Sequence, residues 1–213
     1  MLTEKKDSSK FKAPIKGVTG VILAGGKSSR FGKNKALVEI DGTRLIDRIA
    51  QRIGSIFERL IIISNTPEEY RYLHLPIYVD LIKGLGPIGG IYTGLEAIHD
   101  KAGFFVACDM PSLNESLIRY IIEVREDYDA VVPRIRELME PLHALYAKTC
   151  LPVMRTLIRS GNYQTMAAFQ MIRVRYVDEK EIRAFDPQLK SFLNINRPDE
   201  LPDIRGKILH DGR

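Results

Sequence analysis

A cationic, glycine-containing segment near the start of the sequence has the residue types needed to bind phosphate groups. It runs from Leu23 to Lys35, reads LAGGKSSRFGKNK and contains no acidic residue. Its four cations are Lys27, Arg30, Lys33 and Lys35. The adjacent glycines Gly25 and Gly26 let a backbone approach a ligand closely and present N–H groups to an anion. Cations beside such donors suit a polyphosphate. The segment predicts a triphosphate-binding loop, and a turn with solvated lysines is the alternative.

Two common phosphate-binding loops do not fit this spacing. A P-loop has the pattern GxxxxGK[ST]. Residues 26–28 supply its end, but the first glycine would stand at position 21, which is Val21. A dinucleotide-binding loop needs GxGxxG, which Gly25, Gly26 and Gly32 do not form. The spacing therefore disfavours a P-loop kinase and a NAD-dependent enzyme.

Acidic residues follow two other apolar segments. Asp109 comes after the apolar run 104–107. A carboxylate there can hold Mg²⁺, which proteins bind with one or two carboxylates, water and substrate phosphates. A helix cap or a turn is the alternative for this aspartate. Asp80 follows the apolar residues 77–79 and precedes the glycine-rich segment 84–90. The N–H groups of such a segment can meet an anion where a helix begins.

Together these features favour nucleotidyl transfer. That chemistry depends on positioning a triphosphate and neutralising its charge rather than on an enzyme nucleophile. No Ser-His-Asp or Cys-His arrangement is recognisable in the sequence. Cys108, at the end of a predicted strand, is interpreted as a core residue. His143, in the apolar run LHALY, is given a structural role, with a catalytic role as the alternative.

These residues have to be positioned by alternating strands and helices. Short apolar runs predict strands, and apolar residues spaced three or four apart predict helices. The expected strands are 18–24, 60–64, 77–79, 104–107, 130–132, 142–146 and 174–177. The expected helices are 45–57 with Thr43 as its cap, 88–98, 114–125 capped by Asn114, 151–158, 165–169, and one that opens at 198–201. Asp41-Gly42 predicts a turn, and Arg134 and Arg136 are expected on a solvated hairpin.

The alternation predicts the fold class. We expect an α/β protein with a Rossmann-like, doubly wound, mostly parallel sheet flanked by helices. Residues 17–213 are predicted to form a single domain, and residues 1–16 a flexible basic tail. In such folds ligands bind at the carboxyl ends of the strands. The residues singled out above follow predicted strands, so the sequence predicts one site at that edge of the sheet.

The amino-acid composition limits the classes of binding partner and the cellular compartment that we expect. The chain has 213 residues, of which 45% are hydrophobic, and no apolar run of about 18 residues that would span a membrane. The net charge is +5, and residues 1–16 contribute +3 of it, so nucleic acid is not an expected partner. The two cysteines, Cys108 and Cys150, disfavour a disulfide framework and a thiolate zinc site. We expect a cytoplasmic protein.

Five segments, in order, resemble the MobA-type nucleotidyltransferases, the molybdenum cofactor guanylyltransferases. They are LAGGKSSRFG with KAL at 23–37, GPIGG at 86–90, CDMP at 108–111, PLHALY at 141–146 and NINRPDEL at 194–201. The resemblance covers about residues 17–204 and implies a fold like that of the nucleotide-diphospho-sugar transferases. The lysine-rich extension before Gly17 is not part of the family pattern. The first segment alone also fits sugar-nucleotide or cytidylyl transferases.

The resemblance implies a reaction and the residues that carry it. GTP, with Mg²⁺ as cofactor, would react with molybdopterin that is usually loaded with molybdenum. The products would be molybdopterin guanine dinucleotide and pyrophosphate. Catalytic roles fall on Lys35, Arg30 and Asp109; nucleotide contacts on Leu23, Ala24, Gly25, Gly26, Lys35, Asn65, Asp80 and Asp109; the metal on Asp109; and the pterin side on Asn194 and Asn196. Arg30 is placed on the triphosphate by its charge.

Two other functions stay open at this point. One is a related nucleotidyltransferase that uses CTP or a sugar phosphate, because base choice depends on a few contacts around Leu23, Asn65 and Asp80. The other is a non-catalytic adaptor that delivers cofactor to molybdoenzymes or their chaperones. The presence of Lys35 and Asp109 argues against the adaptor.

Overall fold

The computed structural model describes residues 13–25 and 34–195. Its strands are β1 (Ile15–Leu23), β2 (Glu39–Ile40), β3 (Thr43–Arg44), β4 (Phe57–Ile63), β5 (Ile77–Tyr78), β6 (Ala102–Ala107), β7 (Ala130–Ile135), β8 (Leu138–Met139), β9 (His143–Ala147) and β10 (Val174–Asp178). Its helices are α1 (Leu45–Ile56), α2 (Pro87–Ala97), α3 (Glu115–Glu123), α4 (Leu151–Arg159), α5 (Thr165–Phe169) and α6 (Glu179–Arg183). Short 3₁₀ turns are η1 (Lys35–Leu37), η2 (Pro67–Glu69), η3 (Arg71–Leu73), η4 (Lys148–Cys150) and η5 (Lys190–Phe192).

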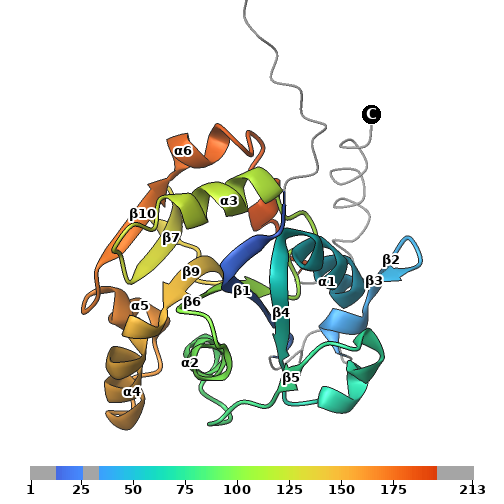
Figure 1. Ribbon diagram of the computed structural model, residues 1–213, viewed down its shortest axis with the longest axis horizontal. Helices are drawn as coiled ribbons and strands as arrows, with labels where there is room; N and C mark the ends of the chain where they lie inside the picture. The colour runs from blue at the N-terminus through green and yellow to red at the C-terminus, as the bar shows by residue number, and fades with distance from the viewer. Residues whose placement is uncertain (1–12, 26–33, 196–213) are drawn as a thin grey trace, which may run out of the picture.

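One sheet organises the described residues (Figure 1). Its strand order is β10-β7-β9-β6-β1-β4-β5, with β8 paired to β7. β1 pairs in parallel with both β4 and β6, and β4 pairs in parallel with β5. β9 is antiparallel to β6 and β7. The chain builds β4 and β5 on one side of β1 and then crosses to β6 on the other, which is the reversal of strand order typical of doubly wound folds. The predicted mostly parallel α/β fold is confirmed.

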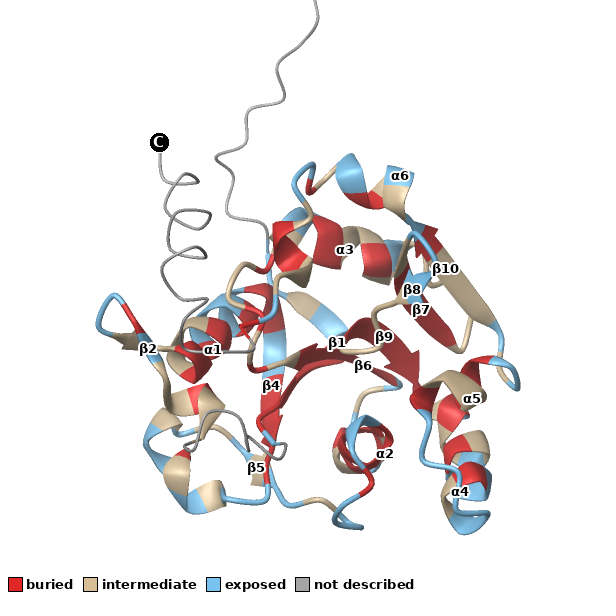
Figure 2. Ribbon diagram, turned by 180° about the vertical axis from the view of Figure 1, so that it is seen from behind, coloured by how far each residue is buried: buried red, intermediate tan, exposed pale blue. Residues whose placement is uncertain are grey.

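The two faces of the sheet bury different side chains of the same strand. Along β1, Ile22 packs with α1 and α3, whereas Val21 and Leu23 pack with α2. Figure 2 shows α1, α3 and α6 over one face and α2, α4 and α5 over the other. Ile22 and Val21 are both fully buried, as expected for a strand covered on both sides.

The predicted elements within the described residues are present, with ends shifted by a few residues. β1 begins at Ile15, so Ile15 and Lys16, placed in the tail by the sequence, belong to the sheet. Residues 1–12 of the predicted tail and the helix opening at 198–201 lie outside the described residues. The hairpin expected at Arg134 and Arg136 is the β7–β8 pair.

The predicted capping role of Thr43 is wrong. Thr43 lies in β3, opposite Ile40, and Arg44 occupies the cap position without a side-chain cap bond. The Leu45 N–H instead donates to the Val38 carbonyl over 2.9 Å, so the hairpin rather than a hydroxyl sets the start of α1. Asn114 caps α3 as predicted, since its Oδ1 accepts from the Leu117 N–H at 3.0 Å.

Within the described ranges, no helix has the length and apolarity required to cross a membrane.

Candidate functional site

The carboxyl ends of the central strands meet at one edge of the sheet. Leu23, the last residue of β1, is in register with Ile63 of β4 and Ala107 of β6. Beyond the strand ends, the Ala24 N–H donates to the Ile63 carbonyl over 2.9 Å. The Cys108 N–H donates to the Leu23 carbonyl over 3.2 Å. The segments that leave these strands therefore start side by side.

Lys35 and Asp109 form the charged centre of this edge. Lys35 begins η1 and its Nζ lies 2.7 Å from Asp109 Oδ2. The two side chains are only 15% and 22% exposed. Asp109 Oδ1 is buried and has no hydrogen-bond partner among the described residues. One carboxylate oxygen thus neutralises the lysine while the other keeps its lone pairs for a ligand.

A second carboxylate repeats this arrangement on the other side of β4. Asn65, which follows β4, donates its amide to Asp80 Oδ2 over 2.7 Å. Asp80 Oδ1 is buried and unpartnered within the part of the chain that the structure describes. The Leu81 N–H, next along the chain, donates to Thr93 Oγ1 of α2 over 3.0 Å and fixes this turn. Asp80 can accept hydrogen bonds from a bound N–H or O–H donor.

The first turn of α2 lies close to the end of β1 because of two glycines. Gly86 has φ +67° and ψ −149°, a conformation that L side chains rarely adopt, and Pro87 follows as the first helical residue. A Cβ at Gly90 would lie 3.2 Å from Leu23 Cδ2. The GPIGG motif therefore lets the helix start pack directly against the last residue of β1.

The segment after η5 returns to the same edge. The Ile195 N–H donates to the Asp109 carbonyl over 3.1 Å, which places Asn194 next to the loop that carries the carboxylate. Asn194 is exposed. The structure thus brings Leu23, Ala24, Lys35, Asp109 and Asn194 to one edge. Three predicted site residues, Gly26, Arg30 and Asn196, lie outside the described residues.

The family follows from a comparison with known proteins. The model of the MobA-like NTP transferase domain matches residues 20–175. The chain belongs to the MobA-like NTP transferases. The predicted family is confirmed, and so is the class of enzyme, a nucleotidyltransferase.

Individual relatives of this MobA-like chain resemble it over nearly its whole length. A molybdenum cofactor guanylyltransferase of Desulfosudis oleivorans is 41% identical, and the match covers 90% of this chain and 96% of that one. A probable molybdenum cofactor guanylyltransferase of Pelotomaculum thermopropionicum is 37% identical, with 88% and 91% covered. The crystal structure of molybdopterin-guanine dinucleotide biosynthesis protein A from Archaeoglobus fulgidus superposes with a TM-score of 0.80 at 25% identity and covers 91% and 100%.

His143 and Cys108 lie in the core of this MobA-like transferase. His143 is fully buried and meets Phe104 edge to face, with ring centroids 5.3 Å apart, and Phe192 at 4.9 Å. Burial lowers the pKa of His143 to about 4. Burial likewise raises the pKa of the Cys108 thiol to about 12. Both observations support the structural roles inferred from the sequence, since neither group is in a form suited to proton transfer or nucleophilic attack near neutral pH.

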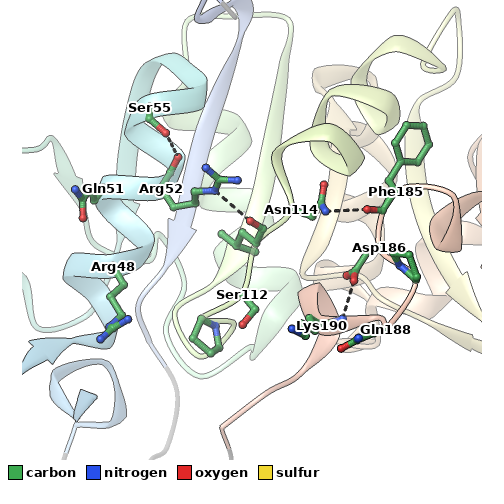
Figure 3. A pocket seen from close by; sticks show the side chains of 13 residues that line it. Arg48, Gln51, Arg52, Ser55, Ser112, Asn114, Phe185, Asp186, Gln188 and Lys190 are labelled. Carbon is green, nitrogen blue, oxygen red and sulfur yellow. Dashed lines mark hydrogen bonds between the residues drawn. The ribbon is translucent and has the colours of Figure 1, made fainter. Parts of the chain in front are cut away.

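A cavity of about 800 Å³ lies on the α1 side of the MobA-like fold, and none of the predicted site residues lines it. Figure 3 shows α1 on one wall and the segments around Asn114 and Asp186 on the other. Arg52 Nε donates to the Leu113 carbonyl across it over 3.1 Å. Neither Lys35 nor Asp109 lines the cavity, whereas Pro111 and Ser112, two and three residues after Asp109, do.

Three residues beside Lys35, namely Asn34, Glu69 and Tyr70, were not predicted from the sequence. The side-chain amide of Asn34 donates to Glu69 Oε2 at 2.5 Å and to the hydroxyl of Tyr70 at 2.7 Å. Asn34 immediately precedes Lys35, so these contacts hold the residue beside the lysine. The signal in the sequence was an asparagine at the start of a short helical turn, a position where this side chain accepts a backbone hydrogen bond.

Proposed function

We propose that the protein transfers GMP from GTP to molybdenum-loaded molybdopterin, giving molybdopterin guanine dinucleotide and pyrophosphate. The observation that carries the proposal is the Lys35–Asp109 pair at the carboxyl edge of the sheet. It occurs in a chain that is 41% identical to a molybdenum cofactor guanylyltransferase. A mostly buried cation beside a carboxylate oxygen suits a triphosphate with its metal ion.

Mg²⁺ is the cofactor that fits the donors present. Among the described residues no group of three or more His, Cys, Asp or Glu side chains could hold a metal alone. Magnesium does not require such a group, because it is bound by one or two carboxylates with water and substrate phosphates. The unpartnered, buried Oδ1 of Asp109 offers one such ligand. Bound there, the ion would supply charge neutralisation on the phosphates.

The other roles in the proposed reaction, binding the substrates and stabilising the transition state, fall to residues of the chain. The Lys35 ammonium would bind a phosphate oxygen and offset the negative charge that develops as the bond to pyrophosphate breaks. Backbone groups of Leu23, Ala24 and Gly25, with Gly26, would contact the nucleotide, and Arg30 the triphosphate. Asn65 and Asp80 would contact the guanosine. Asn194 and Asn196 would face the pterin, whose terminal phosphate attacks the α-phosphate of GTP.

The context of the reaction is part of the same proposal. The two cysteines are unpaired and buried, which suits a cytoplasmic location. Molybdoenzymes or their chaperones would receive the product. The proposed reaction includes no nucleic-acid or membrane partner.

The test is product formation by the purified protein. With Mg²⁺, GTP and molybdenum-loaded molybdopterin, we expect the dinucleotide and pyrophosphate in equal amounts. Absence of product under these conditions would contradict the proposal. A competition in which CTP outcompetes GTP would indicate the cytidylyl relative instead. An Asp109→Ala variant that still supports molybdoenzyme maturation in cells would indicate a delivery adaptor.

A further inference from the structure

The side chain of Asn34 uses both of its functional groups. Its nitrogen donates to Glu69 Oε2 at 2.5 Å and to the Tyr70 hydroxyl at 2.7 Å. Its oxygen accepts from the Ala36 N–H at 3.1 Å. This amide therefore joins the start of η1 to the segment that follows β4.

Tyr70 is a rigid partner for this amide. Its side chain is fully buried in the core that includes Ala24, Ala36 and Cys108. Burial raises the pKa of its hydroxyl to about 12, so the group stays neutral and protonated at physiological pH. A hydroxyl fixed in a packed core offers Asn34 an acceptor that does not move with solvent-exposed loops.

The contacts lie next to the proposed catalytic lysine. Lys35 begins η1, a single 3₁₀ turn of three residues. A lysine side chain has many rotamers, so its ammonium is placed only if the backbone below it is fixed and a counterion holds its end. Asp109 holds the end at 2.7 Å, and Asn34 fixes the backbone.

The end of β4 holds the residue before Gly25, and the segment that follows β4 holds Asn34. Ala24 donates to Ile63, the last residue of β4, and Asn34 is held by Glu69 and Tyr70 a few residues farther along. We infer that Asn34, supported by Glu69 and Tyr70, is a positioning residue that sets the Lys35 ammonium for GMP transfer. The inference rests on the proposed function. It adds three residues that act through the lysine rather than on the substrate.

The chemistry requires an amide at position 34 as long as position 69 carries a carboxylate. An aspartate there would face Glu69 at 2.5 Å with no proton to donate, and the two like charges would repel. Replacing Glu69 by glutamine at the same time would restore the hydrogen bond, because the new amide at position 69 could donate to the carboxylate at position 34. The Ala36 N–H and the Tyr70 hydroxyl could both still donate to the new carboxylate.

The experiment is this exchange of donor and acceptor. We expect Asn34→Asp to lower kcat for dinucleotide formation about tenfold, with KM for GTP changed less than about threefold. We expect Glu69→Gln alone to lower kcat about threefold. The double variant Asn34→Asp/Glu69→Gln should return to within about threefold of wild type. Tyr70→Phe, which removes only the hydroxyl, should lower kcat several-fold.

Tyr72→Phe is the matched control. It removes a hydroxyl two residues farther along, one that donates to Asp47 at 2.6 Å rather than accepting from Asn34. We expect wild-type kcat for this variant. Equal losses in Tyr70→Phe and Tyr72→Phe, or an Asn34→Asp loss that Glu69→Gln does not reverse, would overturn the inference.

A second readout does not depend on the reaction. Acetylation of Lys35 by acetic anhydride, measured on the peptide by mass spectrometry, should be several-fold faster in Asn34→Asp and return to the wild-type rate in the double variant. If wild type makes no dinucleotide, the proposed function fails, and this labelling alone then decides whether Asn34 positions the Lys35 ammonium. Equal labelling of Lys35 in wild type and Asn34→Asp would refute the positioning role.

Discussion

At the scale of single residues, Asp109 and Asp80 have the same pattern of hydrogen bonding. Each gives one oxygen to a nitrogen donor at 2.7 Å, Lys35 Nζ and Asn65 Nδ2 respectively. Each keeps a second, buried oxygen without a partner among the described residues. A buried acceptor without a hydrogen bond costs roughly 1–3 kcal/mol. A ligand that supplied the missing donor or a cation would recover that free energy on binding.

The first prediction concerns the charge of Asp109. Asp109→Asn removes the partner of the Lys35 ammonium and the candidate metal ligand, so we expect kcat to fall by at least about a hundredfold. Steady-state rates of pyrophosphate release measure this. Asp100→Asn is the control, because Asp100 binds Thr19 and Arg59 before the start of β6. It should keep kcat within about twofold, and an Asp109→Asn enzyme of normal activity would disprove the assignment.

The second prediction concerns His143 and acid. Its pKa is about 4 in the folded protein and about 6.5 when unfolded, so the unfolded state binds the proton first as the pH falls. The contribution of His143 to the free energy of unfolding is complete above pH 6.5 and is lost as the pH falls from 6.5 to 4. Asp186 is the nearby acidic group, and it acts against this shift.

Denaturant unfolding of His143→Phe checks the sign. Between pH 7 and pH 5 wild type should lose about 2 kcal/mol more unfolding free energy than the variant, because phenylalanine has no proton to bind. Carboxylates titrate in both proteins and cancel in the difference. Identical pH profiles for the two proteins would show that His143 titrates normally in the folded state.

At the scale of elements, the close contact of α2 with the sheet depends on glycines, because a side chain at these positions would meet the strands. A Cβ at Gly94 would lie 2.5 Å from Phe105 Cε1 and 3.1 Å from Val21 Cγ1. Both neighbours are fully buried, so neither can move aside. The missing Cβ atoms of Gly94 and Gly90 therefore let α2 approach β1 and β6 closely. The first turn of α2 consequently lies at the edge of the sheet that carries the candidate site.

The third prediction follows from this approach. Gly94→Ala should destabilise the protein by about 1–3 kcal/mol through overpacking against Phe105. Gly54→Ala in α1 is the matched change, since its Cβ would meet only Leu60 Cδ2 at an ordinary 3.7 Å. We expect it to stabilise by about 0.5–1 kcal/mol, because alanine is the better helix former. Chemical denaturation of both variants tests the contrast, and a destabilised Gly54→Ala would contradict it.

The elements show what the sequence could predict. Apolar runs such as 104–107 are long enough to identify buried strands, and the carboxyl ends of neighbouring parallel strands lie at one edge, so the approach of Gly25 and Asp109 could be predicted. Lys35 does not directly follow a strand, and the family resemblance placed it in the same site. The two-residue strands of the β2–β3 hairpin carry too little pattern, and so Thr43 was misassigned as a cap. The contact of Asn34 with Glu69 and Tyr70 joins segments whose separation no periodicity specifies.

At the scale of the whole molecule, the reversal of strand order leaves the site between two halves of the sheet. Asn65 and Asp80 follow β4 and β5 on one side of β1, and Asp109 follows β6 on the other. A nucleotide that contacts both sides would bridge the reversal point, where doubly wound folds bind their ligands. Binding should therefore stabilise both halves together.

The fourth prediction measures this bridging. Magnesium with GTP at about 100 times its dissociation constant should stabilise the protein by roughly 2.7 kcal/mol, a rise in Tm of about 5–10 °C. The effect should be larger for GTP than for CTP, ATP or UTP and should shrink in EDTA. A largest shift with CTP would move the assignment to the cytidylyl relatives, and no shift with any nucleotide would contradict triphosphate binding by the free enzyme.

The pairing of β1 with β6 also determines the order in which the strands can pair while the chain is being synthesised. Val18 pairs with Ala102, so the central strand lacks one neighbour until almost half of the chain has left the ribosome. β4 can join β1 earlier, and Ala24 can then reach Ile63. Lys35, however, has no Asp109 to meet before residue 109 emerges. Closing so long a loop is slow compared with local pairing. The nascent chain therefore exposes the uncovered edge of β1 during this stretch of synthesis, and an unpaired strand edge is a site where aggregation can begin.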